Sequence, residues 1–457
     1  MRQLYRFFSI LLCVSFISVG NCGKISRNDN QATYSATNTM STSSTAGTST
    51  AGTSTTTAAA ASTLSAEPYF AKQWALYNDG TFTVESGTSN TMPEMPTITK
   101  PEQGGTNNWN NRDGFRAQLP GGRTGGNTSS RTRRLSYTRY ATRQITAVAD
   151  IDIDAPEAWA VVGDSGRDVV IAVIDTGIDY THEDLSNAIW TNTKEVAGDG
   201  IDNDGNGYID DIYGWDFYNN QAFKVTTSTS EYDHGTHVAG IIAASAENEV
   251  GIAGINANDH VKIMTLKVLG GNNGSGTTDA VVNAIKYAES MGASICNLSF
   301  GTGTYDASLE AAIKDSGMLF ICAAGNATRT MTGDNTDNNP IYPASFDLDN
   351  IISVANVTYD GTLDTTSDYG TTSVDLAAPG TYIYSTVSGN SYEYMTGTSM
   401  AAPMVTAVAA MVYSYQEDLS LSEVKDKLLS SVTKLTSLDG KVATGGMLNA
   451  YNAVTSN

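Results

Sequence analysis

Two hydrophobic patterns alternate along residues 149–457. Short apolar runs rich in branched side chains, VVIAVID at 169–175 and MLFICA at 318–323, are typical of strands buried on both faces of a parallel sheet. Helical stretches stand between and after them, at 235–246, 278–291, 305–315 and 400–415. This alternation predicts a doubly wound α/β fold, a mostly parallel sheet flanked by helices, with its active crevice at the carboxyl ends of the strands.

The amino-terminal pattern is different. The apolar run 7–19 is too short for a membrane-spanning helix, which needs about 20 residues, and Arg2 and Arg6 precede it. We therefore expect residues 1–22 to be an export signal. The residues before Cys22 resemble a bacterial lipobox, with an unusual Asn before the cysteine. Two outcomes stay open: lipidation of Cys22, which would anchor the protein to a membrane, and ordinary signal cleavage.

Two segments of low complexity follow. Residues 23–66 are expected to form a linker, because 29 of the 36 residues at 31–66 are Ser, Thr or Ala and none of them is charged. A single folded domain is expected over 67–457, interrupted at about 78–148 by an insertion rich in Gly, Asn, Thr and Arg. Its basic cluster is either a processing site or a solvated positive loop, and it comprises Arg131, Arg133, Arg134, Arg139 and Arg143.

The net charge restricts the kinds of partner that this protein can bind. The chain has 457 residues and a net charge of −22, and residues 151–457 hold 12 basic against 40 acidic side chains. Such a surface repels phosphate backbones, which excludes nucleic acid as a partner and favours divalent cations. Four cysteines are too few for a disulfide scaffold. Cys296 and Cys322 stand in apolar strand contexts and are expected to be buried thiols, although a disulfide between them stays open.

Three side chains form a candidate catalytic group. Asp175 closes the run VVIAVID, His234 opens a helix in DHGTHVAGIIAA, and Ser399 begins another helix in GTSMAAP. A serine hydroxyl becomes a strong nucleophile when an imidazole accepts its proton, and a buried carboxylate orients that imidazole. The sequence therefore predicts an acid, a base and a nucleophile in the chain order Asp, His, Ser.

Several motifs together resemble the subtilisin-like serine proteases, the subtilase family, over essentially all of 149–457. Three of them carry the catalytic residues in the family's order and spacing. The motifs are AVIDTGIDYTHEDL (172–185), HGTHVAG (234–240), NLSFG (297–301), AAGN (323–326), YPAS (342–345), DLAAPG (375–380), GTSMAAP (397–403) and GGMLNAYNAV (445–454).

This resemblance implies a role for each matching residue. Asp175 is the orienting acid, His234 the general base, Ser399 the nucleophile, and Asn326 the side-chain donor of the oxyanion hole. His237 is a structural residue on the same helix. Substrate is expected to pair antiparallel with two edges, and the binding residues are Gly274, Ser275, Gly276, Leu298, Ser299, Phe300, Gly301, Ala324, Gly325 and Ile341. Ile341, at the base of the S1 pocket, predicts a preference for small or medium apolar P1 residues.

Two calcium sites are expected. By resemblance, the family's tight site comprises Glu67, Asp184, Asn248 and the carbonyls at Val250 and Ile252. The segment 202–213 has oxygen ligands at alternate positions and Gly at the sixth, like an EF-hand loop, but its twelfth residue is Tyr213 in place of Glu. Its candidate ligands are Asp202, Asp204, Asn206, Tyr208 and Asp210; the alternative is a polar turn without an ion.

The chain departs from the family pattern at two places. GTSMAAP is normally followed by His-Val-Ala-Gly, whereas here it is followed by Met404, Val405, Thr406 and Ala407. No recognisable inhibitory prodomain precedes Glu67. We expect a secreted or cell-surface serine endopeptidase, stabilised by calcium, monomeric and acting on protein or peptide substrates. Two alternatives are a surface binding or adhesive protein on an inactive subtilase scaffold, and a partner-binding role for the insertion at 78–148.

Overall fold

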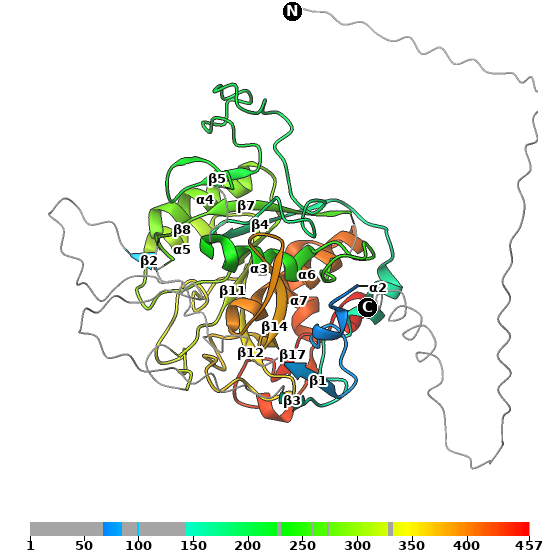
Figure 1. Ribbon diagram of the computed structural model, residues 1–457. Coiled ribbons are helices and arrows are strands. Elements are labelled where there is room, and N and C mark those ends of the chain that lie inside the picture. The colour runs from blue at the N-terminus through cyan, green and yellow to red at the C-terminus, as the bar shows by residue number, and fades with distance from the viewer. Residues whose placement is uncertain are drawn as a thin grey trace, which may run out of the picture. The chain divides into compact units, whose positions relative to one another are not determined.

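A ten-stranded sheet organises the protein (Figure 1). The computed structural model describes residues 67–84, 98–99, 143–225, 230–256, 259–271, 274–327 and 332–456, all within the compact unit Ala51–Asn457. The sheet is parallel from β17 to β5 and antiparallel only at its two ends. In spatial order its strands are β16 (Thr433–Lys434), β17 (Gly446–Met447), β13 (Leu376–Pro379), β12 (Ile351–Val357), β11 (Leu319–Ala323), β10 (Ile295–Leu298), β4 (Val169–Asp175), β7 (Val261–Lys267), β5 (Gly214–Asp216) and β6 (Gln221–Ala222).

Alternate residues of the central strands serve two separate cores. In β4, Ile171 and Val173 pack with one cluster, whereas Ala172 and Ile174 pack with the other. This follows from the period of two along a strand, and it explains why the strand reads as a continuous apolar run. The helices on the first side are α2 (Ala155–Val162), α3 (Asp233–Ala243), α6 (Thr398–Tyr415), α7 (Leu421–Ser430) and α8 (Ala450–Thr455); those on the second are α4 (Thr278–Ser290) and α5 (Ala307–Lys314). The predicted three-layer α/β fold is thus confirmed.

Smaller elements complete the described chain. The two remaining pairs of strands are β1 (Thr81–Val84) with β3 (Arg143–Thr146) and β14 (Ile383–Val387) with β15 (Ser391–Met395), and a three-stranded sheet has the order β2 (Ile98–Thr99), β9 (Ser275–Thr277), β8 (Leu269–Gly270). Single-turn helices lie at Phe70–Lys72, Ser230–Tyr232 and Thr436–Leu438.

The segment before the expected insertion packs into the main core. Trp74, Ala75 and Leu76 are buried in the same cluster as α3 and α6. At the start of the insertion, β1 pairs antiparallel with β3 at its end, so the two ends of the insertion lie side by side. Residues 85–97 and 100–142, including most of the arginine cluster, lie outside the described residues, as do the apolar run 7–19, Cys22 and the linker.

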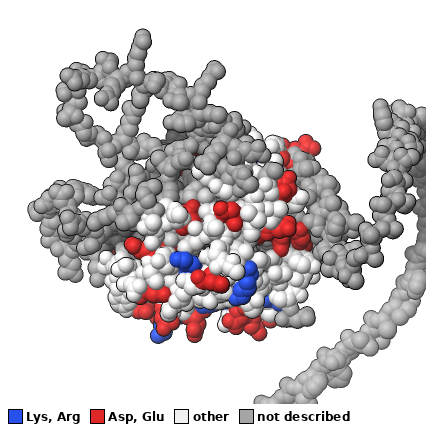
Figure 2. Space-filling model, turned by 90° about the horizontal axis from the view of Figure 1, so that it is seen from below, with Lys and Arg blue, Asp and Glu red and all other residues white. Residues whose placement is uncertain are grey.

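Two further expectations concern thiols and membranes. Cys296 and Cys322 are both buried free thiols, and burial raises the pKa of each thiol. The disulfide that the sequence left open is therefore not formed. Among the described helices, none combines the length and apolar character needed to cross a bilayer. On the face shown in Figure 2, acidic side chains are scattered widely, with a few Lys and Arg among them.

Candidate active site

The acid and base of the candidate site come from a strand end and a helix start. Asp175 is the last residue of β4, and His234 is the second residue of α3. His234 Nδ1 lies 2.8 Å from Asp175 Oδ1, and both side chains are buried. The same Oδ1 accepts the backbone N–H of Thr176 at 2.6 Å. A carboxylate at Nδ1 places the imidazole proton there and leaves Nε2 as the acceptor that a base requires.

The candidate nucleophile stands at the start of α6. Ser399 is the second residue of this helix and is buried. Its hydroxyl donates to the carbonyl oxygen of Ser299 at 3.1 Å. His234 Nε2 is buried and has no hydrogen-bond partner among the described residues. The side chain of Ser399 is thus held against the predicted substrate edge at Ser299, and His234 Nε2 remains an open acceptor.

Asn326 follows β11 and presents one free donor. Its Oδ1 accepts the backbone N–H of Thr398 at 3.0 Å, while its buried Nδ2 has no partner among the described residues. This fixes the amide so that Nδ2 is available to a ligand beside Ser399. A preorganised N–H next to a nucleophile is what a developing oxyanion requires.

One predicted substrate edge is already paired. Gly276 in β9 is flanked by β8 on one side, through Leu269, and by β2 on the other, through Ile98. The pairing of β9 with β2 is parallel. An extended substrate that pairs with Gly276 therefore has to take the place of β2.

The second predicted edge continues from β10. Leu298, Ser299, Phe300 and Gly301 are all buried. Beside them, Ala324 is buried and Gly325 has a φ of 122°. A Cβ at Gly325 would lie 2.2 Å from Asp368 Oδ2, so this position requires glycine. Ile341 is partly buried and packs against the main core.

One buried lysine, in the strand next to Asp175, was not predicted from the sequence. Lys267, the last residue of β7, stands in register with Asp175. Its Nζ donates to the carbonyls of Thr176 at 2.8 Å and Leu269 at 2.6 Å, and it lies 2.9 Å from a carboxylate oxygen of Glu231. This ammonium group links the segment after Asp175 to strand β8. In the sequence, the only indication that Lys267 is buried is that its neighbours are apolar.

The expected tight calcium site is assembled from distant segments. Asn248 donates its backbone N–H to Glu67 Oε1 at 3.0 Å and its Nδ2 to Asp184 Oδ1 at 2.9 Å, while the N–H of Ile252 donates to Asp184 Oδ2 at 3.0 Å. Burial raises the pKa of Glu67 and raises that of Asp184 to about 6, and the Glu67 charge adds to the latter shift. Glu67 Oε2 is buried without a partner. Val250 donates its N–H to Asn248 Oδ1 at 2.8 Å. A cation could be bound by these two buried carboxylates, since one of them, Glu67, has an oxygen without a partner.

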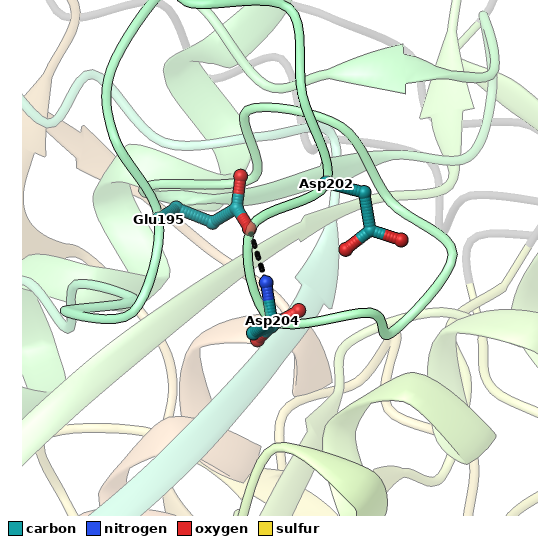
Figure 3. Close-up of side chains that lie close together, drawn as sticks. All are labelled: Glu195, Asp202 and Asp204. Atoms are coloured by element: carbon teal, nitrogen blue, oxygen red, sulfur yellow. Dashed lines mark hydrogen bonds between the residues drawn. The ribbon is translucent and has the colours of Figure 1, made fainter.

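The second expected calcium loop has a different set of acidic groups than the sequence indicated. Carboxylate oxygens of Glu195, Asp202 and Asp204 lie within 4.8 Å of one another (Figure 3). Glu195 Oε1 also accepts the N–H of Asp204 at 3.2 Å, drawn as the dashed line. Glu195 was missed because it precedes the loop. Its carboxylate is the third acidic group of this cluster, whereas the twelfth position of the loop, which is Glu in an EF-hand, is Tyr213 in this chain.

The other predicted members of this loop have other contacts. The carboxylate of Asp210 accepts the backbone N–H groups of Gly198 at 2.7 Å and Gly200 at 3.2 Å, and it is not part of the acidic cluster. Asn206 donates its Nδ2 to Asp204 and to the buried Asp211. The ring of Tyr208 packs edge-on against Trp215 and Tyr287, which leaves its carbonyl as its candidate ligand atom.

Comparison with known proteins gives the class of protein that this fold and site define. A profile of the subtilase family matches residues 166–450, and the chain therefore belongs to the subtilase family. Subtilisin-like protease 1 of Plasmodium falciparum is 38% identical over 302 residues, which are 62% of this chain and 43% of that protein. Thermitase of Thermoactinomyces vulgaris is 34% identical over 305 residues, which are 66% of this chain and 93% of thermitase.

A solved structure shares the fold. A protease from Pseudoalteromonas arctica superposes with a TM-score of 0.51 at 29% identity, over 67% of this chain and 94% of that one. The match to the Plasmodium relatives is partial, because the aligned region spans less than half of each of them.

Proposed function

We propose that this protein is a serine endopeptidase that hydrolyses peptide bonds through an acyl-enzyme intermediate. Ser399 attacks the peptide carbonyl and transfers its proton to His234 Nε2, while Asp175 stabilises the imidazolium that forms. The free Nδ2 of Asn326 donates to the oxyanion. The imidazolium then protonates the leaving amine, and His234 activates water to release the acyl group. The observation that carries this proposal is the buried 2.8 Å contact between Asp175 and His234, with Nε2 left open.

One experiment tests the nucleophile. Wild-type protein should cleave casein and react with a fluorescent organophosphonate, whereas Ser399→Ala should do neither. Ser353→Ala is the matched control, because Ser353 is also buried and its hydroxyl has no partner among the described residues. It should keep both activities. A Ser399→Ala protein that still cleaves casein above a mock preparation would contradict the proposal, and an inert wild type would favour a binding role for the scaffold.

We further propose that calcium stabilises the fold at two places. The amino-terminal site would be held by Glu67, Asp184, Asn248 and the carbonyls of Val250 and Ile252. The loop site would be held by Glu195, Asp202 and Asp204. Support comes from the buried unpartnered oxygen of Glu67 and from three converging carboxylates, whose mutual repulsion a divalent cation would relieve. A ligand that binds only the folded state at about a thousandfold excess over Kd stabilises it by roughly 4 kcal/mol.

The proposal for the cellular location rests on the sequence alone. We propose export through residues 1–22, with Cys22 as the lipidated amino terminus, 23–66 as a spacer and 67–457 as a monomeric catalytic domain. Expressed in a bacterial host, the wild type should partition into the detergent phase and Cys22→Ala into the aqueous phase. Equal partitioning of the two proteins would show that Cys22 carries no anchor.

A further inference from the structure

Thr406 lies two helical turns along α6 from the candidate nucleophile. It stands on α6 at the i+7 position from Ser399, on the same helix face, where the family motif normally has Ala. It is completely buried, and its hydroxyl donates to Asn297 Oδ1 at 2.8 Å. The Ala402 carbonyl, at 3.1 Å, is the second acceptor within reach of the same proton.

A chain of hydrogen bonds continues from Asn297 to the nucleophile. Asn297, in β10, donates its Nδ2 to Ser299 Oγ at 2.9 Å, and Ser299 Oγ donates to the backbone carbonyl of Ser399 at 2.9 Å. Ser299 in turn accepts the Ser399 hydroxyl on its own carbonyl at 3.1 Å. Ser299 therefore contacts both the main chain and the side chain of Ser399, and every member of this chain is buried.

The hydroxyl of Thr406 satisfies the accepting end of the Asn297 amide. The two ends of an asparagine amide have similar size, but one accepts and the other donates. While Oδ1 accepts from Thr406, Nδ2 donates to Ser299 Oγ, and the single hydroxyl proton of Ser299 goes to the Ser399 carbonyl. Without the Thr406 hydroxyl, the amide of Asn297 could turn over and take the Ser299 proton on Oδ1. The carbonyl of Ser399 would then lose its donor.

We infer that Thr406 is a positioning residue for Ser399, acting through Asn297 and Ser299. The inference rests on the proposed function, in which Ser399 is the nucleophile. Correct placement of a nucleophile affects the chemical step more than substrate binding. Loss of the hydroxyl should therefore lower kcat and leave KM almost unchanged.

The test is Thr406→Val in the full chain, because valine keeps the shape of threonine and removes only the hydroxyl. With active sites counted by phosphonate titration, kcat on a peptide substrate should fall about 5- to 20-fold and KM should stay within about twofold. Thr406→Ser, which keeps the hydroxyl, should restore most of kcat. The control is Ser414→Ala on the same helix, because the buried hydroxyl of Ser414 donates to the Arg167 carbonyl at 2.7 Å and has no link to Ser399. Its kcat should equal that of the wild type.

The outcomes are distinguishable. A wild-type kcat for Thr406→Val, with only a lowered melting temperature like that of Ser414→Ala, would overturn the positioning role and leave the proposed function intact. Wild-type protein that cleaves no more than Ser399→Ala would overturn both. If Thr406→Val does not fold, Thr406→Ser and Thr406→Ala carry the test, because both lack the methyl group and only the first keeps the hydroxyl. Serine should then exceed alanine in kcat by the same factor, and equal values would overturn the inference.

Discussion

Asp175 and His234 form a 2.8 Å pair that is closed to solvent, with relative exposures of 0% and 2%. A second pair of the same type, His260 with Asp168, has a similar length of 3.0 Å but lies at the surface, with exposures of 29% and 88%. Only the first pair is shielded from solvent, as the proposed acid and base require. The exposed pair provides an internal control.

Asp175→Asn should lower kcat by about 10⁴-fold, because an amide can hold the imidazole in the wrong tautomer. Asp168→Asn should leave kcat within about twofold of the wild type, since solvent screens an exposed pair. Steady-state kinetics of both variants check this prediction. Comparable losses in the two variants would contradict the assignment of the acid.

Asn326→Leu should lower kcat by about 10²- to 10³-fold, a magnitude carried over from removal of the corresponding donor in subtilisin. The variant also removes the acceptor for the Thr398 N–H, so Asn326→Asp is needed beside it. The aspartate keeps an acceptor but cannot donate from a carboxylate, and it should be at least as slow. A full rate in either variant would remove Asn326 from the mechanism.

Glu195→Gln should reduce the stabilisation by calcium, measured as the difference in melting temperature between millimolar calcium and chelator. Asp199→Asn is the control in the same loop, because the exposed Asp199 is outside the acidic cluster and accepts the Ile201 N–H and Asn203 Nδ2. In the wild type, chelation should lower the melting temperature by several degrees and expose residues 199–211 to self-cleavage. Magnesium should restore little, because it prefers a smaller octahedral site. Equal effects of calcium on the wild type and Glu195→Gln would contradict the site.

Asp152 should make stability depend on pH. Burial raises the pKa of this carboxyl from 3.8 to about 8, and the charge of Asp154 adds to the shift. The folded state therefore holds the proton more tightly than the unfolded chain. This stabilisation is complete below about pH 4 and is lost as the pH rises through about 8.

The measurement compares melting temperatures at about pH 5 and about pH 8. The fall from the lower to the higher pH should be smaller for Asp152→Asn than for the wild type, because the amide does not ionise. Asp168→Asn, at an exposed position, should follow the wild type. Parallel curves for the wild type and Asp152→Asn would contradict this prediction.

Ile341→Gly should broaden the specificity toward large P1 side chains. The family resemblance places Ile341, which is partly buried, at the base of the S1 pocket, so a glycine there should make that pocket deeper. We expect kcat/KM for P1 phenylalanine to rise about tenfold relative to P1 alanine, measured with a matched peptide pair. An unchanged ratio would show that another residue limits the pocket.

The local signals in the sequence predicted the α/β fold and the positions of its main strands and helices closely. The apolar run at 169–175 is strand β4, and the stretch at 278–291 corresponds to α4, Thr278–Ser290. Helix α5 begins later than its predicted start of 305, because Asp306 caps it by accepting the N–H groups of Ser308 and Leu309. Strand and helix periods are properties of neighbouring residues, so a sequence displays them directly.

The sequence by itself determined the parallel sheet and the chain order of the candidate residues Asp175, His234 and Ser399. Only the tertiary structure decided that Glu195 joins Asp202 and Asp204, that Lys267 donates to the carbonyl of Thr176 next to Asp175, and that the Thr406 hydroxyl contacts Asn297. The physical reason is that periodicity and turn chemistry act over a few residues. The partner of a buried polar group depends instead on which strands and helices folding brings together, and no local pattern encodes that choice.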